Sequence, residues 1–197
     1  MLKALGLGPA EETIYTALLA RPTASAEELA RRTGAGRAET ERILRDLSAY
    51  ELTQNLEKID TSDRNWLRST AVQTTWSFRS RLEPDVYSRG LPILSPAYDA
   101  PVDGMNTLPA RSGIEVGLSV EGHAGYTPGA VEAASLSYSY DGGTTWTLAP
   151  TEQRDGKWTA VLDLTAATGK QVTTKATLTD ANGNAVTQTI TRAYDVR

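Results

Sequence analysis

Apolar residues recur at helical spacing through roughly the first fifty positions of the chain. A first helix can begin with Pro9, whose missing N–H does no harm in a first turn, and must end before Pro22. Its apolar face is formed by Ile14, Tyr15, Leu18 and Leu19. The spacing therefore predicts a short amphipathic helix at the start of the chain.

Two further helices follow at close intervals. Ser25 with Glu28 three residues later is typical of a capping box, and Gly34 is a typical C-terminal stop. A third helix begins at about Arg37 and turns inward its apolar residues, which are Ile43, Leu44 and Leu47. Three short helices with a glycine-containing turn between the second and third predict a helix-turn-helix unit over residues 1–52.

From about Trp66 the apolar period changes from near 3.6 to 2. Alternating segments share one face each: Val72, Thr74, Trp76 and Phe78; Ile114, Val116, Leu118 and Val120; Leu136, Tyr138 and Tyr140; Trp158, Ala160, Leu162 and Leu164; Val172, Thr174, Ala176 and Leu178; Val186, Ile190 and Tyr194. Short alternating segments separated by Gly, Asp and Asn turns predict an antiparallel sandwich of the immunoglobulin or fibronectin kind over residues 66–197.

Two stretches show neither period. In residues 53–65 the helical pattern of apolar residues stops abruptly, and we interpret them as a linker or as the junction between two joined sequences. Residues 81–113 show no regular spacing of apolar residues and contain several prolines, which predicts an extended connector rather than a helix or central strand. The fold class is therefore α+β in two parts, a three-helix unit followed by an all-β sandwich.

The helical stretch is specific enough to suggest a family. "LKALGLGPAEETIYTALLARP" followed by "SAEELARRTGAGRAETERILRDLSAYEL" resembles the N-terminal winged-helix segment of bacterial regulators of the LuxR and TrmB-like type. The resemblance implies that the third helix enters the DNA major groove and that a β-hairpin wing follows. The implied DNA-binding residues are Arg37, Glu41, Arg42 and Arg45.

The charge of the helical part leaves an alternative open. Residues 1–52 carry 7 Lys+Arg and 8 Asp+Glu, a net charge of 7 − 8 = −1, whereas phosphate contacts need positive charge at the interface. The alternative is a small helical cap or dimerisation unit whose arginines are merely solvated. DNA binding, where it occurs, would use residues 25–52.

The segment SYDGGTTW concentrates hydroxyls, an aspartate, glycines and an aromatic ring. It resembles the Asp-box hairpin of sialidase-like propellers, and its physics is local. Asp141 can accept hydrogen bonds from the turn backbone, and glycines supply positive φ angles. We predict a structural turn rather than a catalytic site, formed by Ser139, Asp141, Gly143 and Trp146.

The loop TDANGNAVTQ could be a metal-binding loop or a hairpin turn. Asp180, Asn182 and Asn184 alternate, as oxygen ligands do in calcium loops. The twelfth position of an EF-hand pattern would be Thr191 rather than an acid, and the flanks read as strands. A hairpin turn with Asn-Gly at its apex explains the same residues, so we predict no metal site.

Residue types restrict catalysis further. The chain has no Cys and a single His, His123, which removes thiolate chemistry, Cys-based zinc sites and any mechanism that needs two imidazoles. Asp99, Asp103 and Glu115 could form an acid–base pair only if the fold brought them together. We predict a protein that is not an enzyme and uses no cofactor.

The β-rich part resembles a second family. "TTWSFRSR", "LPILSPAYDAPVDGMNTLPA", "SLSYSYDGGTTWTLAP" and "KATLTDANGNAVTQTITRAYDVR" are similar to the C-terminal accessory domain of large secreted subtilisin-like serine proteases. The similarity covers residues 66–197. Such a protease needs an Asp, a His and a nucleophilic Ser on its own α/β domain, and no such nucleophile segment is present.

These observations favour a non-catalytic binding protein whose sandwich takes a protein or carbohydrate partner. The alternative is a one-component DNA-binding regulator in which the sandwich senses a signal or oligomerises. A third interpretation is a recombined chain whose halves share no mechanism. The net charge of −4 and the absence of long apolar runs argue against a membrane partner. Without a signal peptide the chain reads as cytoplasmic, although its β part resembles secreted domains.

Overall fold

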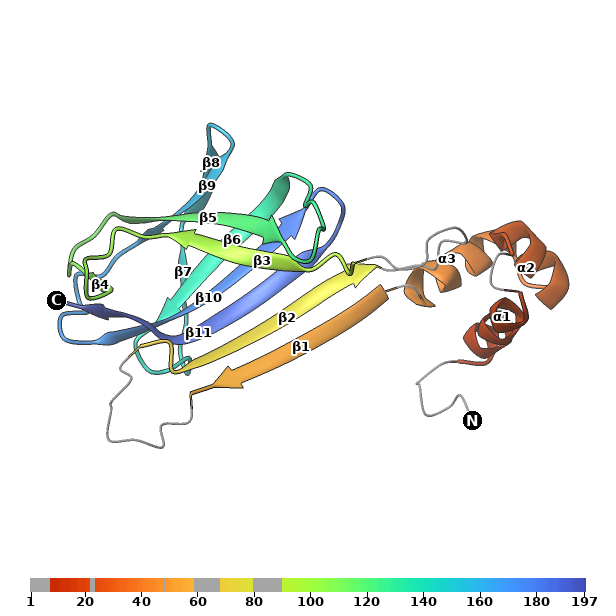
Figure 1. Cartoon of the computed structure of the whole chain (residues 1–197), viewed down its shortest axis with the longest axis horizontal. Coiled ribbons are helices and arrows are strands. Elements are labelled where there is room, and N and C mark those ends of the chain that lie inside the picture. The colour runs from red at the N-terminus through yellow and green to blue at the C-terminus, as the bar shows by residue number, and fades with distance from the viewer. Residues whose placement is uncertain (1–7, 22–23, 48, 59–67, 80–89) are drawn as a thin grey trace. The chain divides into compact units, whose positions relative to one another are not determined.

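The structure, a computed structural model, describes residues 8–21, 24–47, 49–58, 68–79 and 90–197. The chain divides into two compact units, and the first division along the chain falls between Tyr50 and Glu51. Three helices build the first, which we call the helical unit, and strands build the second, which we call the strand unit. Figure 1 labels the elements of both.

The helical unit consists of α1 (Pro9–Ala20), α2 (Ala26–Thr33) and α3 (Arg37–Leu47). Their ends follow from the sequence as predicted. Pro9 lies in the first turn of α1. At α2, the amide of Glu28 donates to Ser25 Oγ at 3.2 Å and the amide of Ser25 donates to Glu28 Oε2 at 3.3 Å. Gly34 ends α2 with φ of +73°, a left-handed conformation that favours glycine.

One apolar residue from each helix forms the centre of the helical unit. Ile14, Leu29 and Ile43 are each 0 % exposed. The predicted side-chain positions of Leu19 and Leu47 lie outside the described residues. A core this small depends on helix ends that are well capped, which is why the Ser25 and Gly34 caps matter to the position of α3.

The strand unit contains two sheets. The strands are β1 (Ala49–Glu57), β2 (Ala71–Arg79), β3 (Leu94–Asp99), β4 (Thr107–Leu108), β5 (Ile114–Gly122), β6 (Val131–Ser139), β7 (Thr147–Ala149), β8 (Thr151–Arg154), β9 (Lys157–Leu162), β10 (Gln171–Asp180) and β11 (Ala185–Val196). The larger sheet has the order β1-β2-β11-β10-β6-β7, with β4 pairing in parallel with β11, and the smaller has the order β3-β5-β9-β8. Figure 1 shows β1 beside β2 at one side of the larger sheet.

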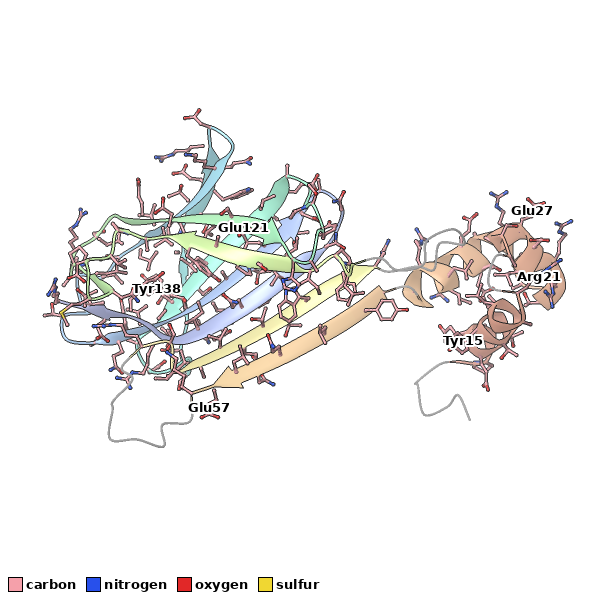
Figure 2. The ribbon with its side chains drawn as sticks, viewed as in Figure 1. Tyr15, Arg21, Glu27, Glu57, Glu121 and Tyr138 are labelled. Carbon is pink, nitrogen blue, oxygen red and sulfur yellow. The ribbon has the colours of Figure 1, made fainter. Side chains whose placement is uncertain are left out.

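The sheets share one apolar core, as the alternation predicts. Ile114 and Val116 from β5 meet Leu136 from β6 and Leu178 from β10 in a single buried cluster. Tyr138, labelled in Figure 2, belongs to the same cluster, and its hydroxyl donates to the carbonyl of Asp163 at 3.3 Å. The fold class is thereby confirmed: three helices precede two antiparallel sheets.

The expected linker at residues 53–65 is wrong over its first part. Residues 53–57 belong to β1, which begins only two positions after α3 ends and pairs with β2. The hydrophobic pattern did not mark this strand, because both of its faces are exposed. β1 and β2 lie where the resemblance implied a β-hairpin wing, and their action as a wing stays a prediction. Residues 59–65 lie outside the described residues. The boundary at residue 52 and the independence of the two parts stay predictions.

The expected connector at residues 81–113 also contains strands. Residues 80–89 lie outside the described residues, but β3 and β4 fall in the remainder. Pro96 is tolerated in β3 because β3 is an edge strand. The amide of His123 donates to Ile93 O, so by alternation the main chain of Pro96 faces away from β5.

Candidate nucleic-acid interface

The α2–turn–α3 segment has the geometry of a helix-turn-helix. Gly34, Ala35 and Gly36 connect the helices, and α3 begins at the next residue. The amide and the hydroxyl of Thr40 both donate to the carbonyl of Gly36, at 2.9 and 3.0 Å, which fixes the first turn of α3. Thr40 is completely buried, and sequence reasoning missed this role because a polar residue on a helix is expected outside.

The predicted DNA-binding residues all lie on the exposed side of α3: Arg37, Glu41, Arg42 and Arg45. Thr40 and Ile43 mark the opposite, buried side. At about 100° per residue, the four predicted residues occupy one continuous arc facing away from the helical core. That these residues bind DNA stays a prediction.

Ion pairs at four-residue spacing hold two of these arginines. Arg37 Nε contacts Glu41 Oε1 at 2.9 Å, and Arg42 Nη1 contacts Asp46 Oδ2 at 2.8 Å. The hydrogen bond and the charge of Glu41 raise the pKa of Arg37 above its ordinary value, so this guanidinium stays charged. All four side chains are well exposed, and exposed pairs of this kind contribute little stability. The arginines can therefore exchange their partners at little cost.

Two further arginines lie at the C-terminal end of α2. Arg31 and Arg32 occupy its last turn and are exposed, while Glu27 and Glu28 occupy its first turn. This placement suits the helix dipole and supplies a structural reason for both charges. Glu27 and Arg21 are labelled on the helical unit in Figure 2. A shallow groove between α1 and α2 also touches Arg32.

The SYDGGTTW turn is a closed hydrogen-bond network. Asp141 Oδ1 accepts from the hydroxyl of Ser139 at 2.6 Å and from the amides of Thr144 and Thr145 at 3.0 and 2.9 Å. Gly143 has φ of +95°, and a side chain there would approach the ring of Trp146. The hydrogen bond from Ser139, with those from Thr145 and Thr144, lowers the pKa of Asp141 well below its ordinary value. The carboxylate is thus fully used within its own turn.

Asp180 is similarly occupied at the β10–β11 turn. It is 0 % exposed, and its Oδ1 accepts from the amides of Asn182 and Asn184 at 3.0 and 2.9 Å. Its Oδ2 accepts from the hydroxyl of Tyr126 at 2.7 Å. Burial raises the pKa of Asp180, but the hydrogen bonds, led by that of Tyr126, outweigh this and lower it. Both oxygens of Asp180, which a calcium ion would need as ligands, therefore already accept hydrogen bonds from amides and a hydroxyl.

Of the residues considered for catalysis, Asp99 ends β3, Glu115 lies on the neighbouring strand β5, and Asp103 and His123 lie in loops. His123 is exposed in the loop after β5. Asp103 accepts from the amides of Met105 and Thr107 at 2.9 and 3.0 Å and pairs with Arg197, so it closes a turn. In the part of the chain that the structure describes, no three acidic or histidine side chains gather as metal ligands. Likewise, no helix among the described residues is long and apolar enough to cross a membrane.

Comparison with known proteins identifies the helical part. Residues 2–61 match the family described as the sugar-specific transcriptional regulator TrmB, a range that contains α1, α2, α3 and β1. The N-terminal part of the chain, residues 2–61, is therefore similar to the helix-turn-helix domain of this regulator family. No curated protein and no solved structure gives a significant match. The resemblance of residues 66–197 to a protease accessory domain has no support from these comparisons.

Proposed function

We propose that this protein is a DNA-binding transcriptional regulator whose helical unit contacts duplex DNA. The observation that carries the proposal is the exposed, arginine-bearing face of α3 within a segment that matches a family of transcriptional regulators. The proposal prefers the DNA-binding alternative to our first expectation, a non-catalytic binding protein whose sandwich takes a protein or carbohydrate partner, because the match falls on the helix-turn-helix itself.

The chemistry of α3 suits the second helix of such a motif, which lies in the major groove with its N-terminal residues nearest the bases. Arg37 opens α3 and can donate two hydrogen bonds to guanine. Arg42 and Arg45 supply positive charge farther along the helix, for phosphates or bases. On binding, guanine would replace the carboxylate of Glu41 at Arg37, and a phosphate would replace the carboxylate of Asp46 at Arg42.

The strand unit would then act as the sensor or oligomerisation part of the regulator. A carbohydrate effector agrees both with the partner expected from the sequence and with the description of the matched family. Such a regulator works beside DNA, which would place it in the cytoplasm.

Titration of fluorescently labelled duplex DNA tests the proposal. The probe is a duplex that the full chain has selected from a random pool, followed by fluorescence anisotropy at several salt concentrations. Arg42→Ala should weaken binding about tenfold and reduce the slope of log affinity against log salt by about 0.9, because one phosphate contact is lost.

Arg154→Ala is the matched control. Arg154 also pairs with a carboxylate, Glu152, on an exposed surface, but it lies on β8 of the strand unit. Its loss should leave DNA binding unchanged. Equal effects of the two substitutions, or binding that ignores salt, would contradict the proposal.

A further inference from the structure

The first strand is a long open edge. β1 has nine residues, all exposed, and ends the larger sheet (Figure 1). The other edge strands are less open: β7 and β8 have three and four residues, and β3 contains Pro96. Monomeric proteins protect long edges with prolines, bulges or inward charges. β1 has no proline, and its inner face carries no charge.

The inner face of β1 continues the apolar face of β2. Thr53 Oγ1 lies 3.0 Å from Thr75 Oγ1, and Gln73 Nε2 donates to Asn55 Oδ1 at 2.8 Å, which fixes the register of the two strands. Leu52 then lies opposite Trp76, whose indole N–H donates to the carbonyl of Leu94 on β3.

Two leucines of β1 on this apolar face remain partly exposed. Leu52 and Leu56 follow on the same side of β1 and remain 45 % and 55 % exposed. About half of each of these leucines is therefore accessible to solvent. Among the described strands, β1 pairs on one side only, and it carries two half-exposed leucines, a combination that a further pairing strand would satisfy.

The direction of the main-chain groups follows from one hydrogen bond. The amide of Lys58 donates to Thr70 O at 2.9 Å, so Lys58 directs its main chain at β2. Because antiparallel ladders alternate, the N–H and C=O groups of the odd-numbered residues of β1 point away from β2. The short Thr53–Thr75 side-chain contact agrees, since side chains approach most closely at non-hydrogen-bonded pairs.

We propose that β1 pairs with β1 of a second copy of this chain, antiparallel and centred on Thr53. In this register Ala49 lies opposite the partner's Glu57, so the strands overlap over their whole length. The outward groups form about ten hydrogen bonds. Each Leu56 lies opposite the partner's Tyr50, and each Leu52 lies opposite the partner's Gln54, so each leucine gains a side-chain neighbour on the same face of the extended sheet.

Charge selects this register over its neighbours. A pairing centred on Gln54 would place Glu51 opposite the partner's Glu57, twice in each dimer, and like charges directly opposite are unfavourable. A pairing centred on Leu52 would leave Glu57 beyond the partner's strand and lose a pair of outward groups. Centring on Thr53 opposes Glu51 to the partner's Asn55, a neutral amide. Figure 2 labels Glu57 on β1.

The dimer would carry two helix-turn-helix units, as recognition of a palindromic site requires. The pairing itself goes beyond the proposed function and does not rest on it, because β1 belongs to no part of the DNA contact proposed above. Its tests therefore use the full chain without DNA, so that failure of either proposal is visible on its own.

Light scattering after size-exclusion chromatography tests the association. The full chain should have twice its mass of 21.2 kDa at high concentration and dissociate on dilution. Leu52→Lys should weaken the dimer about 100-fold, because it removes apolar burial and adds a charge beside its symmetry mate. Leu148→Lys is the matched control, since Leu148 is 68 % exposed on β7, at the opposite edge of the same sheet. A monomer at every concentration, or equal loss with both lysines, would overturn the proposal.

Single cysteines test the register, and they are selective because the chain has no other Cys. Thr53→Cys should form a disulfide-linked dimer on mild oxidation, because position 53 lies opposite itself at about 5.5 Å between Cα atoms. Glu57→Cys should not, because position 57 lies opposite Ala49. Both substitutions are at exposed positions, and circular dichroism verifies folding. Equal cross-linking of the two variants, or none for Thr53→Cys, would contradict the pairing.

Discussion

At the scale of single residues, two aspartates organise the turns of the strand unit. Asp141 serves its own turn, so the sequence SYDGGTTW was sufficient to predict its acceptor role. Asp180 also receives the hydroxyl of Tyr126, which lies 54 residues away in the chain. No local pattern announces such a partner, and only the fold brings the loop containing Tyr126 to the β10–β11 turn.

Replacement of Asp180 tests the weight of this buried acceptor. Asp180→Ala leaves the amides of Asn182 and Asn184 and the hydroxyl of Tyr126 without their acceptor. We expect the free energy of unfolding to fall by about 3 kcal/mol, as measured by urea titration. Asp163→Ala is the control, because Asp163 is exposed and its carboxylate accepts hydrogen bonds from the amide and hydroxyl of the neighbouring Thr165 alone among the described residues. Equal losses would show that the buried network is not special.

The pKa of Asp141 predicts an acid sensitivity. Hydrogen bonds lower this pKa in the folded state, so the folded protein holds fewer protons than the unfolded chain near the unfolded pKa of about 3.9. The resulting stability is present above that pH and is lost as the pH falls through the folded pKa. The urea midpoint should therefore fall from about pH 6 to about pH 3.

Asp141→Asn isolates this contribution, since an amide keeps the shape of the carboxylate but cannot gain the proton. Its urea midpoint should fall less over the same range of pH. An acid dependence identical to that of the unsubstituted chain would contradict the assignment to Asp141.

At the scale of elements, the sequence predicted those helices that have capping residues and those strands that have a buried face. The ends of α2 were predicted from its caps, Ser25 with Glu28 and Gly34. β5 and β10 were predicted from the alternation of apolar and polar residues, which matches their alternating burial. β1 escaped because it is exposed on both faces. β3 escaped because Pro96 argued against a strand, although its nitrogen faces the open side of an edge. Sequence patterns report burial, and edge strands have little of it.

The cap of α2 gives a prediction at this scale. Ser25→Ala removes the acceptor of the Glu28 amide and should lower the opening free energy of α2 by about 1 kcal/mol. Amide hydrogen exchange of α2 measures this change. Ser25→Asp should restore protection, because aspartate caps helices equally well. Unchanged exchange in Ser25→Ala would show that packing alone holds the helix.

At the scale of the whole molecule, the proposed DNA contact and the proposed pairing edge belong to different units. The α3 side chains proposed to contact DNA belong to the helical unit, while the pairing edge belongs almost wholly to the strand unit. The sequence showed the helix-turn-helix and the arginines of its third helix. The resemblance implied that a β-hairpin follows α3, but the sequence could not show that β1 forms an edge of the larger sheet, because sheet order depends on contacts distant in the chain.

Removal of the helical unit gives the prediction at this scale. Residues 49–197 contain every described strand, together with the apolar cluster that joins both sheets. This fragment should unfold in one cooperative urea transition and should retain the β-type circular dichroism of the full chain. A fragment without a cooperative transition would show that the helices are part of the sandwich.

The most direct test of the central claim compares this fragment with the full chain on one DNA duplex. Fluorescence anisotropy should show salt-dependent binding by the full chain and none by residues 49–197 under the same conditions. Binding of the fragment with the affinity of the full chain would contradict the assignment of DNA recognition to α3.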